Sequence, residues 1–113
     1  MKPGDLVLLR FPQSNLQQGK LRPALVLAVA PGQHADVLLA LVTSRGYQAV
    51  AGFDEVVEPT DPDFALTRLK SRSVIRLARL ATVEPAVIAA RLGSISPDRL
   101  TRIRNHLVSW LKP

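Results

Sequence analysis

Residues 24–43 read ALVLAVAPGQHADVLLALVT and form the most apolar stretch of this 113-residue chain. Two apolar runs, residues 24–30 and 37–42, flank the turn-forming pair Pro31-Gly32. Short apolar runs bounded by proline and glycine are typical of buried strands. We therefore predict a hairpin of two strands, over residues 24–30 and 36–43, at the centre of the hydrophobic core.

Outside this hairpin, the pattern predicts further short strands and one helix. Strands are expected over residues 6–11, 55–58, 73–81 and 88–92, with one helical turn opening at Pro85. Ser96-Pro97-Asp98 supplies an N-cap, a proline at the first helical position and an acidic first turn. Apolar residues then recur at helical spacing, which predicts an amphipathic helix from Pro97 to Leu111. The fold class is mainly β with a C-terminal helix (α+β), a small, strongly bent antiparallel barrel in one domain spanning residues 1–113.

The composition favours a soluble protein that binds a polyanion. The net charge is +6, and eleven of the fifteen basic residues are arginine. Such a balance attracts nucleic-acid phosphates. The absence of cysteine excludes disulfides and thiolate metal sites and fits a reducing cytoplasm. The apolar run near the N-terminus, residues 6–9, is too short for a signal peptide or a membrane span, so we expect a cytoplasmic protein without a membrane partner.

Aromatic residues are scarce, because only three Phe, one Tyr and one Trp are present. Proteins that bind single strands by stacking bases on a sheet usually carry clustered aromatic rings on neighbouring strands. The spacing of the five rings shows no such cluster. A stacking platform of that kind is not expected.

Arg22 ends a basic loop at the entrance of the first apolar strand, and Thr43 closes the second. A guanidinium and a hydroxyl at these positions could converge on one anion. The planar fork of arginine matches a phosphate better than the point charge of lysine. RNA or DNA is the obvious candidate partner.

Several short motifs occur in an order that resembles the MazF/PemK-like family of toxin endoribonucleases from toxin–antitoxin modules. Each motif is weak alone, but together they cover nearly the whole chain. They are Gly4-Asp5-Leu6-Val7, Phe11-Pro12, the run from Lys20 to Leu27, Val42-Thr43-Ser44, Ser73-Val74-Ile75-Arg76, Ala81-Thr82-Val83 and the run from Arg91 to Ser96.

The resemblance implies a homodimeric SH3-like barrel that cuts single-stranded RNA, including mRNA, at short preferred sequences. It also implies that no metal or other cofactor is needed, and that a cognate antitoxin protein covers the RNA groove. The family's catalytic arginine and threonine map onto Arg22 and Thr43. In one branch of the family, Arg76 would belong to an arginine–aspartate pair, but the second position here is Ala78, which leaves Arg76 as an RNA contact and the general base unidentified.

Chemistry limits the roles of these residues. Cleavage by a 2′-hydroxyl requires stabilisation of the charge that develops at phosphorus, which suits Arg22. Arginine does not deprotonate readily, so Arg22 is a poor general base. Thr43 would orient the nucleophile or bind a phosphoryl oxygen. The predicted RNA-binding residues are Gln17, Lys20, Ser44, Arg45 and Arg76.

Other interpretations remain open from the sequence. The chain could be a catalytically degenerate barrel that binds nucleic acid or an antitoxin-like peptide without cleavage, or an adaptor that binds a protein in its groove. Asp61 and Asp63 could offer oxygens to a divalent cation, although a proline-spaced turn explains them better. His34 and His106 have no nearby acid in sequence and are expected to be structural or exposed.

Overall fold

The computed structural model describes residues 1–10 and 20–113. In chain order, the elements of this part are β1 (Asp5–Leu9), β2 (Arg22–Val29), β3 (Val37–Thr43), β4 (Glu55–Val57), α1 (Phe64–Thr67), β5 (Ser73–Val83), the 3₁₀ turn η1 (Pro85–Val87), β6 (Ala90–Ser94) and α2 (Pro97–Leu111). No helix of this part is long and apolar enough to cross a membrane.

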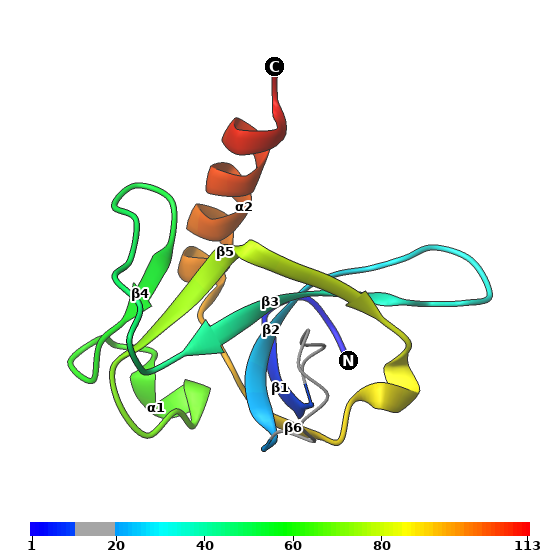
Figure 1. The fold of residues 1–113 in the computed structure, drawn as a ribbon, viewed down its shortest axis with the longest axis horizontal. Coiled ribbons are helices and arrows are strands. Elements are labelled where there is room, and N and C mark those ends of the chain that lie inside the picture. The colour runs from blue at the N-terminus through cyan, green and yellow to red at the C-terminus, as the bar shows by residue number, and fades with distance from the viewer. Residues whose placement is uncertain (11–19) are drawn as a thin grey trace.

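The strands form one antiparallel sheet in the order β4-β5-β3-β2-β1-β6. The predicted hairpin, β2 and β3, lies in the middle of this order. Within the described residues, the edge strands β4 and β6 do not pair with each other, so the curled sheet is a half-closed barrel (Figure 1). The predicted fold class, a bent antiparallel barrel with a C-terminal helix, is confirmed in this form.

Side chains alternate between the two faces of the sheet along each strand, and each face carries a cluster of buried apolar residues. The helix face packs against α2, whose Ile103 is completely buried there. The other face, here called the barrel face, is covered by the curl of the sheet itself and by Ile88. Buried residues of the helix face include Leu6, Leu25, Val42, Val57, Ile75 and Leu77, and those of the barrel face include Val7, Leu9, Ala24, Val26, Leu39 and Leu41.

β5 is longer than the strand predicted over residues 73–81, and it bends in its middle (Figure 1). The bend coincides with a shift in its pairing with β3, because Leu41 pairs with Arg76 whereas Ala40 pairs with Leu80. The residues between these partners are therefore extra on β5. Extra residues of this kind bend a strand and increase its twist, which lets one strand serve both halves of the curled sheet.

The C-terminal helix has the predicted limits. The Ser96 hydroxyl accepts a hydrogen bond from the Arg99 backbone N–H at 3.2 Å, as expected of an N-cap. α2 projects beyond the sheet, with the C-terminus at its far end (Figure 1). The short helix α1 was not predicted. It lies against β6 at Gly93, where a Cβ would collide with the carbonyl oxygens of Leu66 and Thr67.

A buried arginine joins α2 to the connection between β4 and α1. The Arg99 side chain is only 4% exposed, and its guanidinium contacts Asp63 at 2.8 and 2.9 Å, Asp61 at 2.8 Å and Glu55 at 3.1 Å. These bonds hold the pKa of the Asp63 carboxyl well below its usual range. The pKa of Asp61 is also lowered, first by the Glu58 backbone N–H and then by Arg99. The two aspartates considered as cation ligands therefore bind an arginine.

Candidate functional site

The strand register brings Arg22 and Thr43 together. Ala24 pairs with Leu41 between β2 and β3, and the same register continued by two residues places Arg22 opposite Thr43. Residues opposite each other in an antiparallel pair have Cα atoms about 5 Å apart. Because Ala24 and Leu41 belong to the barrel face, Arg22 and Thr43 lie at the end of that same face. That the two side chains converge on one anion stays a prediction.

The Thr43 hydroxyl is engaged in the turn that follows β3. It accepts a hydrogen bond from the Arg45 backbone N–H at 3.3 Å and donates to the Arg45 carbonyl oxygen at 3.2 Å. Both bonds are long and solvent-exposed, so a phosphate oxygen can replace the Arg45 carbonyl oxygen as the acceptor of the Thr43 hydroxyl proton at little cost. Ser44 and Arg45 are exposed in this turn. Thr43 thus shapes the backbone that carries the two neighbouring residues predicted to bind RNA.

Arg76 lies on the same face as Arg22 and Thr43. In β5 it pairs with Leu41, two residues along the strand from the Thr43–Val74 pair. Its guanidinium carbon is 3.7 Å from the centre of the Tyr47 ring, which is a cation–π contact. The neighbouring position Ala78 is exposed and carries no carboxylate. Sequence reasoning missed Tyr47, because nothing in a loop sequence indicates which strand residue its ring will contact.

The remaining residues considered in the sequence lie in different parts of the fold. Lys20 is exposed just before β2, whereas Gln17 lies outside the described residues. His34 lies in the β2–β3 connection, past the end of β2 that is opposite Arg22, and an eight-residue strand spans roughly 23 Å. His106 is on α2, where its Nδ1 is 2.7 Å from the Phe53 carbonyl oxygen. Neither histidine is placed to act beside Arg22.

The acidic residues between 54 and 63 bind groups of the protein itself. Glu55 binds Arg99 and Arg102, and Glu58 binds Arg72. By contrast, Arg22, Arg45 and Arg76 form no ion pair with any residue that the structure describes. The positive charge at this end of the barrel face is therefore left for a partner, and an anion is the partner that it fits.

Comparisons with known proteins agree with this geometry. The model of the family described as "PemK-like, MazF-like toxin of type II toxin-antitoxin system" matches residues 2–111. No curated protein matches the sequence.

Three solved structures share the fold. An endoribonuclease in complex with its cognate antitoxin, from a mycobacterial species, is 19% identical with a TM-score of 0.67, covering 100% of this chain and 97% of that one. The Mycobacterium tuberculosis toxin MazF-mt6 is 16% identical with a TM-score of 0.64, covering 91% and 93%. A second mycobacterial endoribonuclease is 18% identical with a TM-score of 0.63, covering 98% and 90%. Because the family model spans nearly the whole sequence, the chain belongs to the PemK-like, MazF-like toxin family of type II toxin–antitoxin systems.

Proposed function

We propose that this chain is an endoribonuclease toxin that cleaves single-stranded RNA at short sequence motifs, with Arg22 and Thr43 as catalytic residues. One observation carries the proposal: in a member of this toxin family, the β2–β3 register, when continued two residues past the Ala24–Leu41 pair, sets an arginine and a threonine opposite each other. The unpaired positive charge around them supports an RNA substrate. Two solved structures of the same fold are described as endoribonucleases.

The reaction that fits these residues needs no water. The 2′-oxygen of one nucleotide attacks the adjacent phosphorus, and the bond from phosphorus to the 5′-oxygen of the next nucleotide breaks. The 2′-hydroxyl loses a proton and the 5′-oxygen gains one, so the products are a 2′,3′-cyclic phosphate and a 5′-hydroxyl. Arg22 stabilises the charge that develops on the phosphoryl oxygens. The Thr43 hydroxyl binds the phosphate or orients the 2′-hydroxyl.

Purified protein should cleave single-stranded RNA equally well with and without EDTA, because both proposed catalytic groups are side chains. End mapping should find 5′-hydroxyl and cyclic-phosphate termini. An oligonucleotide with one 2′-deoxy substitution at the cleaved position should resist cleavage there, since it lacks the nucleophile. Fragments with 5′-phosphate ends, formed only with a divalent cation, would contradict the mechanism. Tight RNA binding without any cleavage would support the degenerate barrel instead.

The natural partner that we propose is a cognate antitoxin protein in the cytoplasm. Family membership supports this partner, because toxins of type II modules are paired with protein antitoxins. One structure of the same fold is described as a complex with its cognate antitoxin. The exposed arginines at the end of the barrel face suit an acidic segment of such a protein, which would then compete with RNA for the same surface.

We also propose that the toxin is a homodimer. The last turn of α2 exposes Val108, Trp110 and Leu111, and the Trp110 ring forms a T-shaped pair with Phe53, with the ring centres 5.1 Å apart. Apolar side chains gathered at a projecting helix end are typical of an interface. Sedimentation velocity of the free protein should give twice the 12.3 kDa mass of the chain. Trp110→Ser should shift it towards the monomer, and a wild-type monomer at micromolar concentration would refute the dimer.

A further inference from the structure

Tyr47 is linked to two consecutive residues of β5, directly to Arg76 and through Asp54 to Leu77. Its ring lies against the Arg76 guanidinium, and its hydroxyl donates to Asp54 Oδ2 at 2.6 Å. The other oxygen of Asp54 accepts from the Leu77 backbone N–H at 3.1 Å. Because residues 76 and 77 are neighbours in the chain, these contacts close a ring that fixes the guanidinium relative to the strand.

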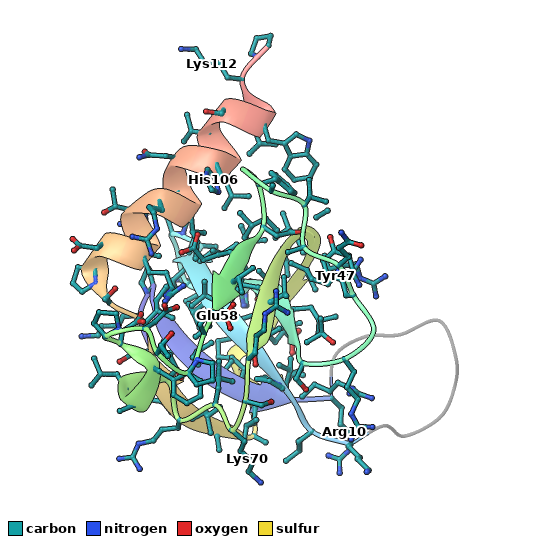
Figure 2. The ribbon with its side chains drawn as sticks, turned by 90° about the vertical axis from the view of Figure 1, so that its left-hand side faces the viewer. Arg10, Tyr47, Glu58, Lys70, His106 and Lys112 are labelled. Carbon is teal, nitrogen blue, oxygen red and sulfur yellow. The ribbon has the colours of Figure 1, made fainter. Side chains whose placement is uncertain are left out.

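The bend in β5 makes this ring possible. Leu77 is the first of the extra residues between the partners of Ala40 and Leu41, so it has no partner in β3. Asp54 is buried and also accepts from the Val50 backbone N–H at 2.8 Å. One carboxylate therefore ties the loop that carries Tyr47 to the strand that carries Arg76. Tyr47 lies on the side of the molecule away from the beginning of α2, the same side as Arg10 at the end of β1 (Figure 2).

The guanidinium of Arg76 still has free donors. Its Nε is buried without a hydrogen-bond partner in the described part of the chain. No carboxylate of that part pairs with it. A fixed cation with unused N–H groups is prepared to bind an anion, because little side-chain entropy is lost when the anion arrives.

The tyrosine itself is suited to holding a cation and not to transferring a proton. Its hydrogen bond to Asp54 raises the pKa of the Tyr47 hydroxyl. The ring therefore stays neutral, and its face attracts the guanidinium through the ring quadrupole. Tyr47 does not supply the missing general base.

We propose that Tyr47, anchored by Asp54, is a positioning residue that holds Arg76 ready to bind an RNA phosphate flanking the one held by Arg22. This inference rests on the proposed function. The spacing supports it, because β3 separates β2 from β5 and two strand spacings amount to about 10 Å. Arginines that extend from two strands at that backbone separation suit different phosphates of one RNA strand.

The test is a double-mutant cycle on RNA binding, measured by fluorescence anisotropy with a 2′-O-methyl oligonucleotide that the toxin cannot cleave. Tyr47→Leu should weaken binding about threefold to tenfold, because Arg76 loses its support. In an Arg76→Gln background, Tyr47→Leu should have almost no further effect. The slope of log affinity against log salt should fall by about 0.7 for Arg76→Gln, as expected for one lost contact to a single-stranded phosphate.

Arg79→Gln is the matched control, because Arg79 is an exposed arginine on the same strand and has no aromatic partner among the residues that the structure describes. In that background, Tyr47→Leu should keep its full effect. Equal losses in both backgrounds, or no loss at all, would overturn the inference. Tyr47→Phe keeps the ring without the Asp54 anchor; it should lose a smaller part of the affinity and provides the same cycle if Tyr47→Leu unfolds. If the wild type neither binds nor cleaves RNA, the proposed function fails as well, whereas normal wild-type activity with unaffected Tyr47 variants removes only this inference.

Discussion

Arg22→Ala should lower the rate of RNA cleavage by roughly a thousandfold or more, the loss found when a fixed cation is removed from a phosphoryl-transfer site. The residue is exposed at the start of β2 and forms no ion pair with the described chain, so its removal should leave the fold intact. Expression of the wild type should arrest growth and degrade mRNA, and Arg22→Ala should abolish both effects. The measurements are single-turnover cleavage in vitro and growth after induction.

Arg104→Ala is the matched control for this experiment. It removes the same charge from an exposed position on α2, which packs on the helix face and not at the end of the barrel face. Arg22→Lys keeps the charge without the planar fork and should recover only part of the rate. A folded Arg22→Ala variant that cleaves RNA at the wild-type rate would show that the catalytic assignment is wrong.

Asp63→Ala should destabilise the protein by roughly 3–5 kcal/mol, because it removes the only carboxylate that makes two bonds to the buried Arg99 guanidinium within the described chain. Asp63 is itself 5% exposed and makes two of the contacts to this guanidinium. The free energy of unfolding can be measured by urea titration. Asp98→Ala is the control, since Asp98 is an exposed aspartate in the first turn of α2, where its loss should cost about 1 kcal/mol or less.

The same pair should make the protein sensitive to acid. Because Arg99 lowers the pKa of Asp63 in the folded state, the stabilisation is complete above the unfolded-state pKa near 4 and is lost progressively as the pH falls below it. Asp63→Asn should flatten this acid-side decrease in the free energy of unfolding. An Asp63→Ala protein that is as stable as the wild type and has the same acid profile would contradict this prediction, because other groups would then suffice to stabilise Arg99.

Much of the fold could be predicted because the deciding signals are local. The hairpin of residues 24–43 follows from two apolar runs around Pro31-Gly32, and the start of α2 follows from Ser96-Pro97. Strand ends were less well predicted: β1 covers Asp5–Leu9 of the predicted 6–11, of which residue 11 lies outside the described residues, and β6 covers Ala90–Ser94, not residues 88–92. Their limits depend on pairing with a neighbour, which the local pattern does not contain.

The candidate site was likewise predicted only in part. Arg22 and Thr43 were identified from their positions at strand ends and from the family resemblance, and their catalytic roles stay predictions until the variants are assayed. The support of Arg76 by Tyr47 and Asp54 could not be predicted. It depends on a bend in β5 and on a loop whose conformation a buried carboxylate determines. The partner of Asp61 and Asp63 could not be predicted for a similar reason, because Arg99 is distant in sequence.

The sequence by itself determined the order and type of the main elements, the basic character of the chain and the family to which its motifs point. These depend on periodicity, turn residues and composition, which act over a few neighbouring positions. Only the tertiary structure decided which charges remain free. Folding pairs the acidic residues of 54–63 with internal donors, four of them with Arg72, Arg99 and Arg102, and strand register sets Arg22, Thr43 and Arg76 on one face. Partner choice inside a fold follows from geometry between distant segments, and no local pattern encodes it.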